Sequence, residues 1–413
     1  MRNTTSMVLA GMLAINCTRT HADEVPAKLH GELGVEHAAG TRHGEAVLTR
    51  AEATLSARFQ AEGCSAKIAL RLRWDARLAP LHTKENELRE AAFVCRFSDW
   101  LLGVGRQAVV WGKADNFRVL DAVHPFDYRE FLLGDKEAAR RPLAMVRIER
   151  QMGELDAAQL LLITERRADV LPGPGDRFSA LFPQGALDRI ATPGKVPPES
   201  TLANAQAGIK WEHTGRQLGY TVNMLNRWSP QATYTFNPQT GAVTRNAYRQ
   251  TLLGGSFDLA LSEWVVRGEA IYTPHVYLPT SSPVPGAPPE YQRNEQSVWV
   301  AGVDRSVGEW FLSAQLFESR VTGSVSEPLQ GRKQRLVSVS ATRSFLQDQL
   351  KVRAFVARDV SQGGTWVSVS AVDELSPGWE LSAGVDVLNG VESSVFGKIK
   401  NESRVKVAIK LRL

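Results

Sequence analysis

Charged and aromatic side chains gather in one block of the chain, between residues 103 and 150. Its acidic and basic groups follow one another at short intervals around a tryptophan: Arg106, Trp111, Lys113, Asp115, Asp121, Asp127, Arg129, Arg140 and Arg141. Opposed fixed charges set the electric field of a pore, or they pin a loop to its surroundings through ion pairs. The block therefore predicts a loop that narrows a channel, a loop that is held by ion pairs, or one that does both.

The histidines do not favour an enzyme. A barrel hydrolase needs a His base beside Asp, Ser or Asn, and none of the histidines in the predicted outer loops lies in a nucleophile motif: His37, His43, His82, His124 and His275. No Cys-x-x-Cys-His sequence is present, and His37 and His43 are too isolated to predict a metal site. We expect no enzymatic activity, no cofactor and no metal.

Two cysteines follow the predicted export signal by some distance. Cys64 and Cys95 fall on neighbouring predicted strands, and a hairpin centred near Ala79-Pro80 would set them opposite each other on apolar faces. In an oxidising compartment this arrangement allows a cross-strand disulfide. Two buried or lipid-facing thiols are the alternative.

The N-terminus has the pattern of an export signal. Arg2 precedes an apolar stretch from Met7 to Ile15, and Thr20-His21-Ala22 offers small residues for cleavage, so residues 1–22 are expected to be removed. Lipid attachment at Cys17 is the alternative. The net charge of +5 has no Lys/Arg tract behind it, so we expect no nucleic-acid partner. No later apolar run approaches the ~18 residues of a membrane helix.

Strict alternation of polar and apolar residues recurs along nearly the whole chain. In residues 64–75 the apolar set includes Ile68, Leu70 and Leu72, and the polar set includes Arg71 and Arg73. Strands that place Lys or Arg at every second residue suit a barrel with a wet interior. The sequence predicts an all-β, single up-and-down antiparallel transmembrane barrel over 23–413, with about 18 strands (16–18). They begin near residues 28, 47, 64, 88, 101, 143, 155, 203, 218, 247, 263, 295, 309, 332, 348, 364, 378 and 399.

Turns and loops alternate in length between these strands. Short turns, such as Glu62-Gly63, alternate with longer segments at 113–142, 165–202, 229–246 and 274–294. Most prolines fall in the long loops, as expected for a residue that cannot donate to a β ladder, and Pro274 is expected at a strand boundary. Tryptophans are expected at the two membrane interfaces: Trp100, Trp211, Trp264, Trp310 and Trp379 at one, and Trp74, Trp111, Trp228, Trp299 and Trp366 at the other.

The charged block also carries a recognisable motif. A Gly-Arg-Gln-x-x-x-Trp-Gly run is followed by an Asp, a Pro-x-Asp element and an Arg-x-Pro element. The matching residues are Gly105, Arg106, Gln107, Trp111, Gly112, Asp121, Pro125, Asp127, Arg140 and Pro142. This block resembles a large family of exported proteobacterial barrel proteins of unknown function. The resemblance implies an outer-membrane barrel, discussed as a porin or as an export partner for hydrophobic compounds, and it implies no reaction.

The predicted inner face of the strands leans basic. Its arginines and lysines include Arg50, Arg58, Lys67, Arg71, Arg73, Arg96 and Arg353. Rings of Arg and Lys favour anions, although a charge-paired, stiff wall is an equal alternative. We predict a porin-like channel of the bacterial outer membrane for small polar or anionic solutes, with residues 113–142 folded into the lumen. The alternative is a plugged barrel with a structural or export role. Outer-membrane lipid, small solutes and a homo-oligomeric or export partner are the expected partners.

Overall fold

A computed structural model describes residues 27–42, 44–76, 84–114, 116–182, 184–194, 202–282, 287–323 and 326–413. The predicted signal peptide, residues 1–22, and the predicted site residue Asp115 lie outside these ranges.

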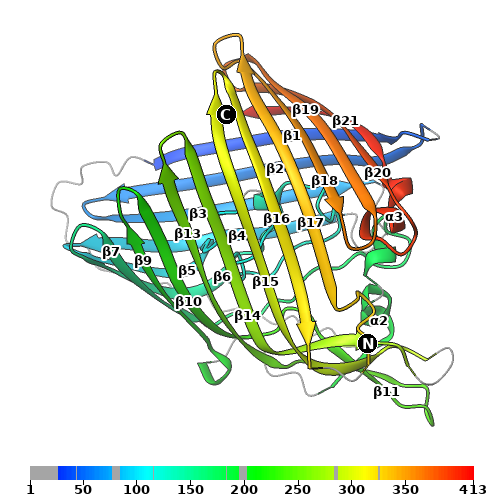
Figure 1. The fold of residues 1–413 in the computed structure, drawn as a ribbon. Coiled ribbons are helices and arrows are strands. Elements are labelled where there is room, and N and C mark those ends of the chain that lie inside the picture. Colours follow the sequence, from blue (N-terminus) through cyan, green and yellow to red (C-terminus); the bar gives the residue numbers. More distant parts are fainter. Residues whose placement is uncertain are drawn as a thin grey trace, which may run out of the picture.

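Eighteen strands form one closed antiparallel sheet. The first nine are β1 (Ala27–Gly40), β2 (Ala46–Ala61), β3 (Cys64–Asp75), β4 (Lys84–Phe97), β5 (Trp100–Gln107), β6 (Leu143–Met152), β7 (Asp156–Ile163), β9 (Gln206–Thr214) and β10 (Leu218–Trp228). The other nine are β13 (Arg249–Leu261), β14 (Trp264–Thr280), β15 (Glu290–Val307), β16 (Trp310–Thr322), β17 (Lys333–Phe345), β18 (Leu350–Asp359), β19 (Gly364–Ser376), β20 (Trp379–Asn389) and β21 (Arg404–Arg412). Each strand pairs with the next along the chain, and β1 pairs with β21. The predicted barrel and its strand count of 18 are confirmed (Figure 1).

The connections include short helices and a second sheet. The helices are α1 (Lys136–Ala139), α2 (Gln184–Ile190) and α3 (Val395–Lys398), with the 3-10 turns η2 (Ser179–Leu181), η3 (Leu202–Asn204) and η4 (Lys400–Glu402). Strands β8 (Thr192–Pro193), β11 (Thr233–Phe236) and β12 (Val243–Asn246) form the small sheet. Figure 1 shows α2, α3 and β11 at the end of the barrel away from the C-terminus. We call that end the long-loop end and the other the short-turn end. No helix in the described ranges is long and apolar enough to cross a membrane.

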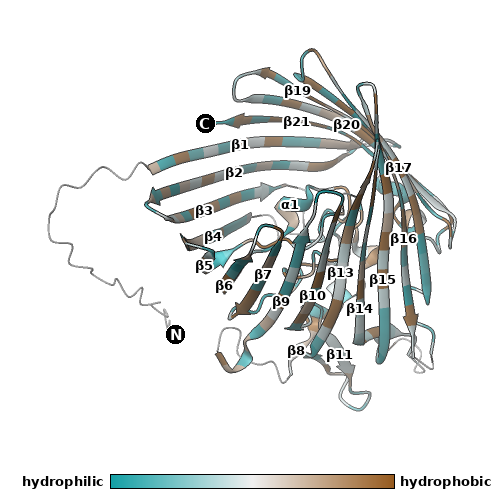
Figure 2. Ribbon diagram, turned by 60° about the vertical axis from the view of Figure 1, so that its left-hand side comes forward, coloured by the Kyte–Doolittle hydropathy of each residue, from teal (hydrophilic) through white to brown (hydrophobic). Residues whose placement is uncertain are grey.

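The two faces of the sheet differ in polarity. On β3 the side chains of Ile68, Leu70 and Leu72 are 45–48% exposed, whereas Arg71 and Arg73, which alternate with them, are 2% and 8% exposed. The apolar set therefore points out of the barrel and the charged set points in, and the same alternation colours most strands in Figure 2. A closed sheet with an apolar outer face has no unpaired edge, which is the arrangement of transmembrane β-barrels.

Tryptophans mark the short-turn end of the outer face. In three pairs of neighbouring strands an arginine on the second strand covers the ring, with its guanidinium carbon 4.7–5.6 Å from the ring centroid: Arg150 on Trp100, Arg305 on Trp264 and Arg343 on Trp310. Two tryptophans expected at the opposite interface lie elsewhere. Trp111 is 3% exposed and Trp366 packs against Phe355 and Phe396, so both belong to the interior and that prediction is wrong.

The loop predicted at 274–294 is mostly strand. β14 continues to Thr280 and β15 starts at Glu290, and a register shift between Thr273 and Val276 accommodates Pro274 inside β14. A bulge leaves one residue outside the ladder, so a proline is tolerated there. The last strand also starts later than the predicted residue 399, because α3 and η4 precede it.

Candidate functional site

Residues 108–142, here called the charged loop, leave β5 through a tightly packed segment. Gly105 has a φ of +114°, and a Cβ there would lie 2.2 Å from the Ala91 carbonyl oxygen, so only glycine fits. Further on, the Trp111 ring lies over Gly208, where a Cβ would come within 2.8 Å of it. The indole N–H donates to the Gln159 side-chain oxygen at 2.6 Å. The loop therefore begins against the inner face of β7 and β9.

Glu269 on β14 holds the next part of the charged loop. Its carboxylate accepts backbone N–H bonds from Lys113, from Ala114 at 2.7 Å and from Leu120 at 3.1 Å. The Lys113 ammonium group continues the contact with the wall at 3.1 Å from the Asp258 carboxylate. These three bonds replace the backbone hydrogen bonds that the loop segment does not form within a sheet or a helix.

Asp127 and Arg129 form the charged centre of the loop. The Arg129 guanidinium binds Asp127 and reaches Glu85 on β4 at 2.6 Å, while Arg73 on β3 reaches Asp127 at 3.2 Å. Burial alone would raise the pKa of the Asp127 carboxyl. The hydrogen bonds and charge of Arg129 outweigh burial and hold that pKa well below its usual range.

Glu130 lies at the meeting point of three arginines. Arg404 on β21 donates to it at 2.8 Å, Arg50 on β2 lies 3.4 Å away, and Arg177 forms a third ion pair. Burial opposes ionisation, yet the three positive charges lower the pKa of Glu130 to about 2. Arg404 also donates to Asp386 and to the Leu133 carbonyl oxygen, so the loop is joined to β20 and β21.

A bulge in β4 serves the helical end of the loop. The register of β3 and β4 shifts between Ala69 and Leu70, which leaves Arg89 as the extra residue. The Arg89 guanidinium donates to the carbonyl oxygens of Glu137, Ala138 and Arg140, and Arg71 also donates to that of Ala138 at 2.8 Å. These are carbonyls at the C-terminal end of α1, which positive side chains stabilise.

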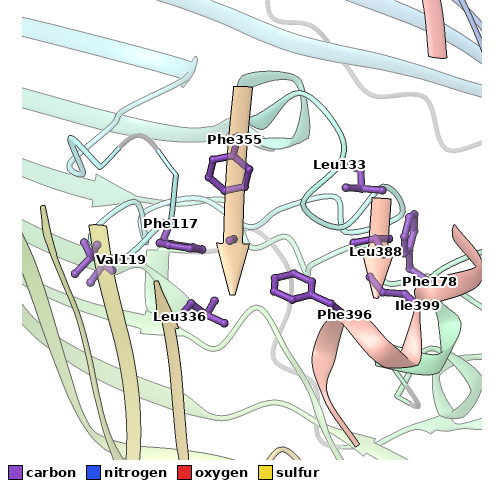
Figure 3. Close-up of a cluster of buried hydrophobic side chains, with 11 residues drawn as sticks. Phe117, Val119, Leu133, Phe178, Leu336, Phe355, Leu388, Phe396 and Ile399 are labelled. Atoms are coloured by element: carbon purple, nitrogen blue, oxygen red, sulfur yellow. The ribbon is translucent and has the colours of Figure 1, made fainter. Parts of the chain in front are cut away.

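Apolar side chains fill the space between loops and wall. One buried cluster joins the charged loop to the segments before α2 and around α3 and to the inner face of β15–β20 (Figure 3). Its members are Phe117, Val119, Leu133, Phe178, Val300, Leu336, Phe355, Ala357, Leu388, Phe396 and Ile399. A second cluster packs Val109, Trp111 and Val123 against strands that include β6, β7 and β10. The loop is therefore held by packing as well as by charge.

Two cavities lie beside residues 133–135 of the charged loop. The larger, about 1230 Å³, is lined by Leu133, Gly134 and Asp135 and by inward residues of β16–β21 that include Lys351 and Arg353. The smaller, about 340 Å³, lies beside Glu130 and Arg50. Both share Leu133, Gly134, Asp135 and Lys406. Polar, water-accessible space therefore remains on one side of the loop.

The structure brings most of the predicted site residues together. Arg140 binds Asp121 at 2.7 Å, and Arg141 donates to the Ala168 carbonyl oxygen. Of the predicted wall residues, Arg50, Arg71, Arg73 and Arg353 contact the loop, the last through Asn116 at 2.6 Å. Lys67 pairs instead with Glu90, and Arg58 and Arg96 lie on the inner face nearer the short-turn end.

Arg106 was predicted in the constriction and lies elsewhere. It pairs in register with Ala91 and Ala144, on the same face as the exposed Val104. Its guanidinium binds Glu165 at 2.6 Å and the Leu88 carbonyl oxygen at 2.8 Å. Because Arg106 precedes the point where the chain leaves β5, strand alternation turns its side chain outward.

Cys64 and Cys95 are directly opposite each other on β3 and β4. Their sulfur atoms are 2.04 Å apart and are joined as a disulfide. The bond lies near the short-turn end, away from the charged loop.

Several residues that hold the charged loop in place were not among the site residues predicted from the sequence. Glu130 lies within the charged block but was not selected. Glu269 lies on β14, 155 residues from the Ala114 backbone N–H that it binds. Arg404 is 274 residues from Glu130, and Arg89 is a bulge residue. Strand alternation places Arg404 on the inner face, but no local pattern predicts which loop residue it meets.

The geometry defines a closed 18-strand β-barrel in which one loop is joined by ion pairs to inward-facing residues of the strands. The chain belongs to the family described as "Protein of unknown function (DUF1302)", which matches residues 101–396. That span includes the charged block. The match does not test the Gly-Arg-Gln-x-x-x-Trp-Gly motif, which stays an interpretation of the sequence.

A comparison with curated proteins found no match. Among solved structures, the chain is similar to an OmpF of Salmonella typhi in complex with daunomycin, at 9% identity and a TM-score of 0.48, with 94% of this chain and 97% of that one covered. It is also similar to a loop-deletion mutant of OmpT, an outer membrane protein of Vibrio cholerae (9% identity, TM-score 0.44, 94% and 99% covered). A mutant porin of Rh. blastica matches at 12% identity and a TM-score of 0.42, with 94% and 100% covered.

Proposed function

We propose that the protein is a porin-like channel of the bacterial outer membrane, narrowed by the charged loop, for small polar or anionic solutes. The observation that carries the proposal is the attachment of one loop to inward-facing residues of well-separated strands: Arg73 on β3, Glu269 on β14, Arg353 on β18 and Arg404 on β21. A loop tied to so many parts of the wall crosses the path of any solute in the lumen.

The preference for anions rests on which charges are compensated. The carboxylates of Asp127, Glu130 and Asp386 are each bound by arginine. By contrast, no acidic group in the described ranges lies within ion-pair distance of Arg58, Arg96 or Lys351. The inner face nearer the short turns thus carries uncompensated positive charge, which favours anions in a pore.

Planar-bilayer conductance tests the constriction. Replacing residues 117–138 by a short Gly/Ser linker removes most of the loop, including Asp127 and Glu130, which bind arginines of the barrel strands. We expect conductance steps several-fold larger than those of the wild type. Shortening the β11–β12 hairpin at residues 237–242 is the matched control and leaves the steps unchanged. Equal steps for the wild type and the 117–138 variant would count against a constriction at this loop.

A plugged barrel with a structural or export role is the second candidate. The two buried apolar clusters favour it, because they exclude water from the space between loop and wall. A wild-type barrel that inserts and folds but passes no current, and that conducts after loop replacement, would support the plug. Heat-modifiable gel mobility establishes insertion and folding in both cases.

A further inference from the structure

Basic side chains gather on the outer face of the barrel at one place near the long-loop end. Register pairs Arg320 with Lys333 and Glu318 with Arg335 across β16 and β17, and Arg358 on β18 is opposite Val337. We call Arg320, Lys333, Arg335 and Arg358, with Glu318, the outward basic cluster. Glu318 binds Arg335 and lies 3.7 Å from Lys333. A single carboxylate among four basic groups leaves an excess of three positive charges.

These side chains point away from the lumen. The residues that alternate with them, Phe317, Leu336 and Ala357, belong to the interior apolar cluster or pack against it. The residues on the same face one step toward the short turns, Leu316, Val337 and Val356, are apolar and 37–43% exposed. The outward basic cluster is therefore the next level above an apolar surface.

The height of that apolar surface matches a membrane. On β16 it runs from Trp310, the interface tryptophan at the short-turn end, to Glu318. Eight residues at ~3.4 Å each in a strand tilted by ~40° rise about 20 Å, close to the ~25 Å apolar band of such barrels. Trp299 lies opposite Glu318 in register and belongs to the same level. The outward basic cluster thus lies where lipid head groups begin.

The charge is local to these strands. At comparable positions on the outer face of β19, β20 and β21 the residues are Thr365, Val387 and Val405. Arg249 on β13, also near the long-loop end, is occupied by Trp228, Asn226 and the Ala205 carbonyl oxygen. Within the described ranges Arg320 and Arg358 have no ion-pair partner, and Glu318 is the one carboxylate within 4 Å of Lys333 and Arg335, so this surface on three adjacent strands keeps an excess of positive charge.

We propose that the outward basic cluster binds the phosphate groups of an outer-leaflet lipid, a phosphorylated glycolipid of the lipopolysaccharide type. Arginine binds phosphate in a bidentate manner and lysine adds a mobile point charge. Neighbouring side chains on paired strands, ~5 Å apart, can engage one phosphate together. This inference rests on the proposed outer-membrane location, but it does not depend on whether the barrel conducts.

Native mass spectrometry of the detergent-solubilised full chain with purified lipid A tests the site. The variant Arg320→Gln, Lys333→Gln, Arg358→Gln removes three charges and keeps the Glu318–Arg335 pair. We expect it to bind lipid A about tenfold more weakly than the wild type, because each lost contact is a charge-assisted hydrogen bond. The control Arg305→Gln, Arg343→Gln removes outward arginines at the short-turn end and is expected to bind as the wild type does.

Two further arms separate the possible sources of binding. Lipid A without its phosphates is expected to bind as weakly to the wild type as to the triple variant, and millimolar inorganic phosphate is expected to compete only weakly. Equal affinity of the wild type and the triple variant, or equal binding of the dephosphorylated lipid, would overturn the inference. All variants are checked for heat-modifiable mobility. If the wild-type protein itself fails to fold or to reach the outer membrane, that result contradicts the proposed location and not the lipid site.

Discussion

Glu130 shows how a single carboxylate organises charges from distant parts of the chain. Arg50, Arg177 and Arg404 all bind it, and each comes from a different segment. Removing one partner of a buried ion pair is costly because the remaining charge is left without compensation.

Glu130→Ala is therefore expected to destabilise the protein by ~3 kcal/mol or more. Urea unfolding followed by tryptophan fluorescence measures the change. The control is Glu392→Ala, since the Glu392 side chain is 87% exposed and pairs with Lys400 at 3.5 Å. Exposed pairs contribute ~0–1 kcal/mol. Equal effects of the two substitutions would argue against Glu130 as an anchor.

Acid is expected to loosen the charged loop in two stages. Burial, with the nearby positive charge of Arg140, lowers the pKa of His124 from 6.5 to about 3. An unfolded or released His124 therefore binds a proton more readily, so attachment weakens as the pH falls from 6.5 toward 3. Glu130, with its pKa lowered from 4.5 to about 2, adds stability above pH 4.5 that is lost as the pH falls through 2.

Both stages can be followed between pH 7 and pH 2 by conductance. The release of peptides by an acid-active protease is an alternative measurement over the same range. His124→Gln keeps a neutral hydrogen-bonding side chain and is expected to abolish the first stage while leaving the second. A first stage of the same size in this variant would show that another group is responsible.

At the scale of elements, the β4 bulge connects the wall to α1. Without the extra residue Arg89, the carbonyl oxygen of Arg140 would lose its donor, and that of Glu137 would keep only the backbone N–H of Arg140. Arg89→Ala is expected to release the segment around α1, so that trypsin cleaves after Lys136 or Arg140 faster than in the wild type. Mass spectrometry of the fragments identifies the sites. Arg58→Ala, on the inner wall but away from the loop, is the control and is expected to leave cleavage unchanged.

The strands could be predicted from sequence because period-two alternation is a local property. The predicted starts at residues 64, 143, 218 and 364 coincide with β3, β6, β10 and β19. The prediction failed in segments that do not have one apolar face turned outward and one polar face turned inward. Pro274 sits in a bulge within a strand that extends beyond the apolar band. Trp111 and Trp366 pack into the two buried apolar clusters rather than at an interface.

The candidate site was only partly predictable for a related reason. The charged block identified the loop, and alternation placed Arg50, Arg71, Arg73 and Arg353 on the inner face. The pairing of Glu130 with Arg404, or of Glu269 with the loop's backbone, depends on how a closed sheet brings distant strands around one segment. No local pattern encodes that closure.

At the scale of the whole molecule, the charges divide between an inner wall and two outer rims. The Trp–Arg pairs occupy the outer rim at the short-turn end, and the outward basic cluster occupies the other. In the proposed channel only the inner set would meet a permeating ion. Selectivity is therefore expected to depend on Arg58, Arg96 and Lys351 and not on outward arginines at the same end.

The variant Arg58→Gln, Arg96→Gln, Lys351→Gln tests this division in protein whose residues 117–138 are replaced by the linker, so that current does not depend on the charged loop. Reversal potentials in a salt gradient are expected to show an anion-to-cation permeability ratio lower by about twofold or more, because fixed charges act on ions at short range in the pore. Arg305→Gln, Arg343→Gln in the same background removes positive charge from the outer rim only, and its ratio is expected to equal that of the parent. A parent that prefers cations, or an outer-rim variant that shifts the ratio as much as the inner-wall variant does, would place the selecting charges somewhere other than on this wall.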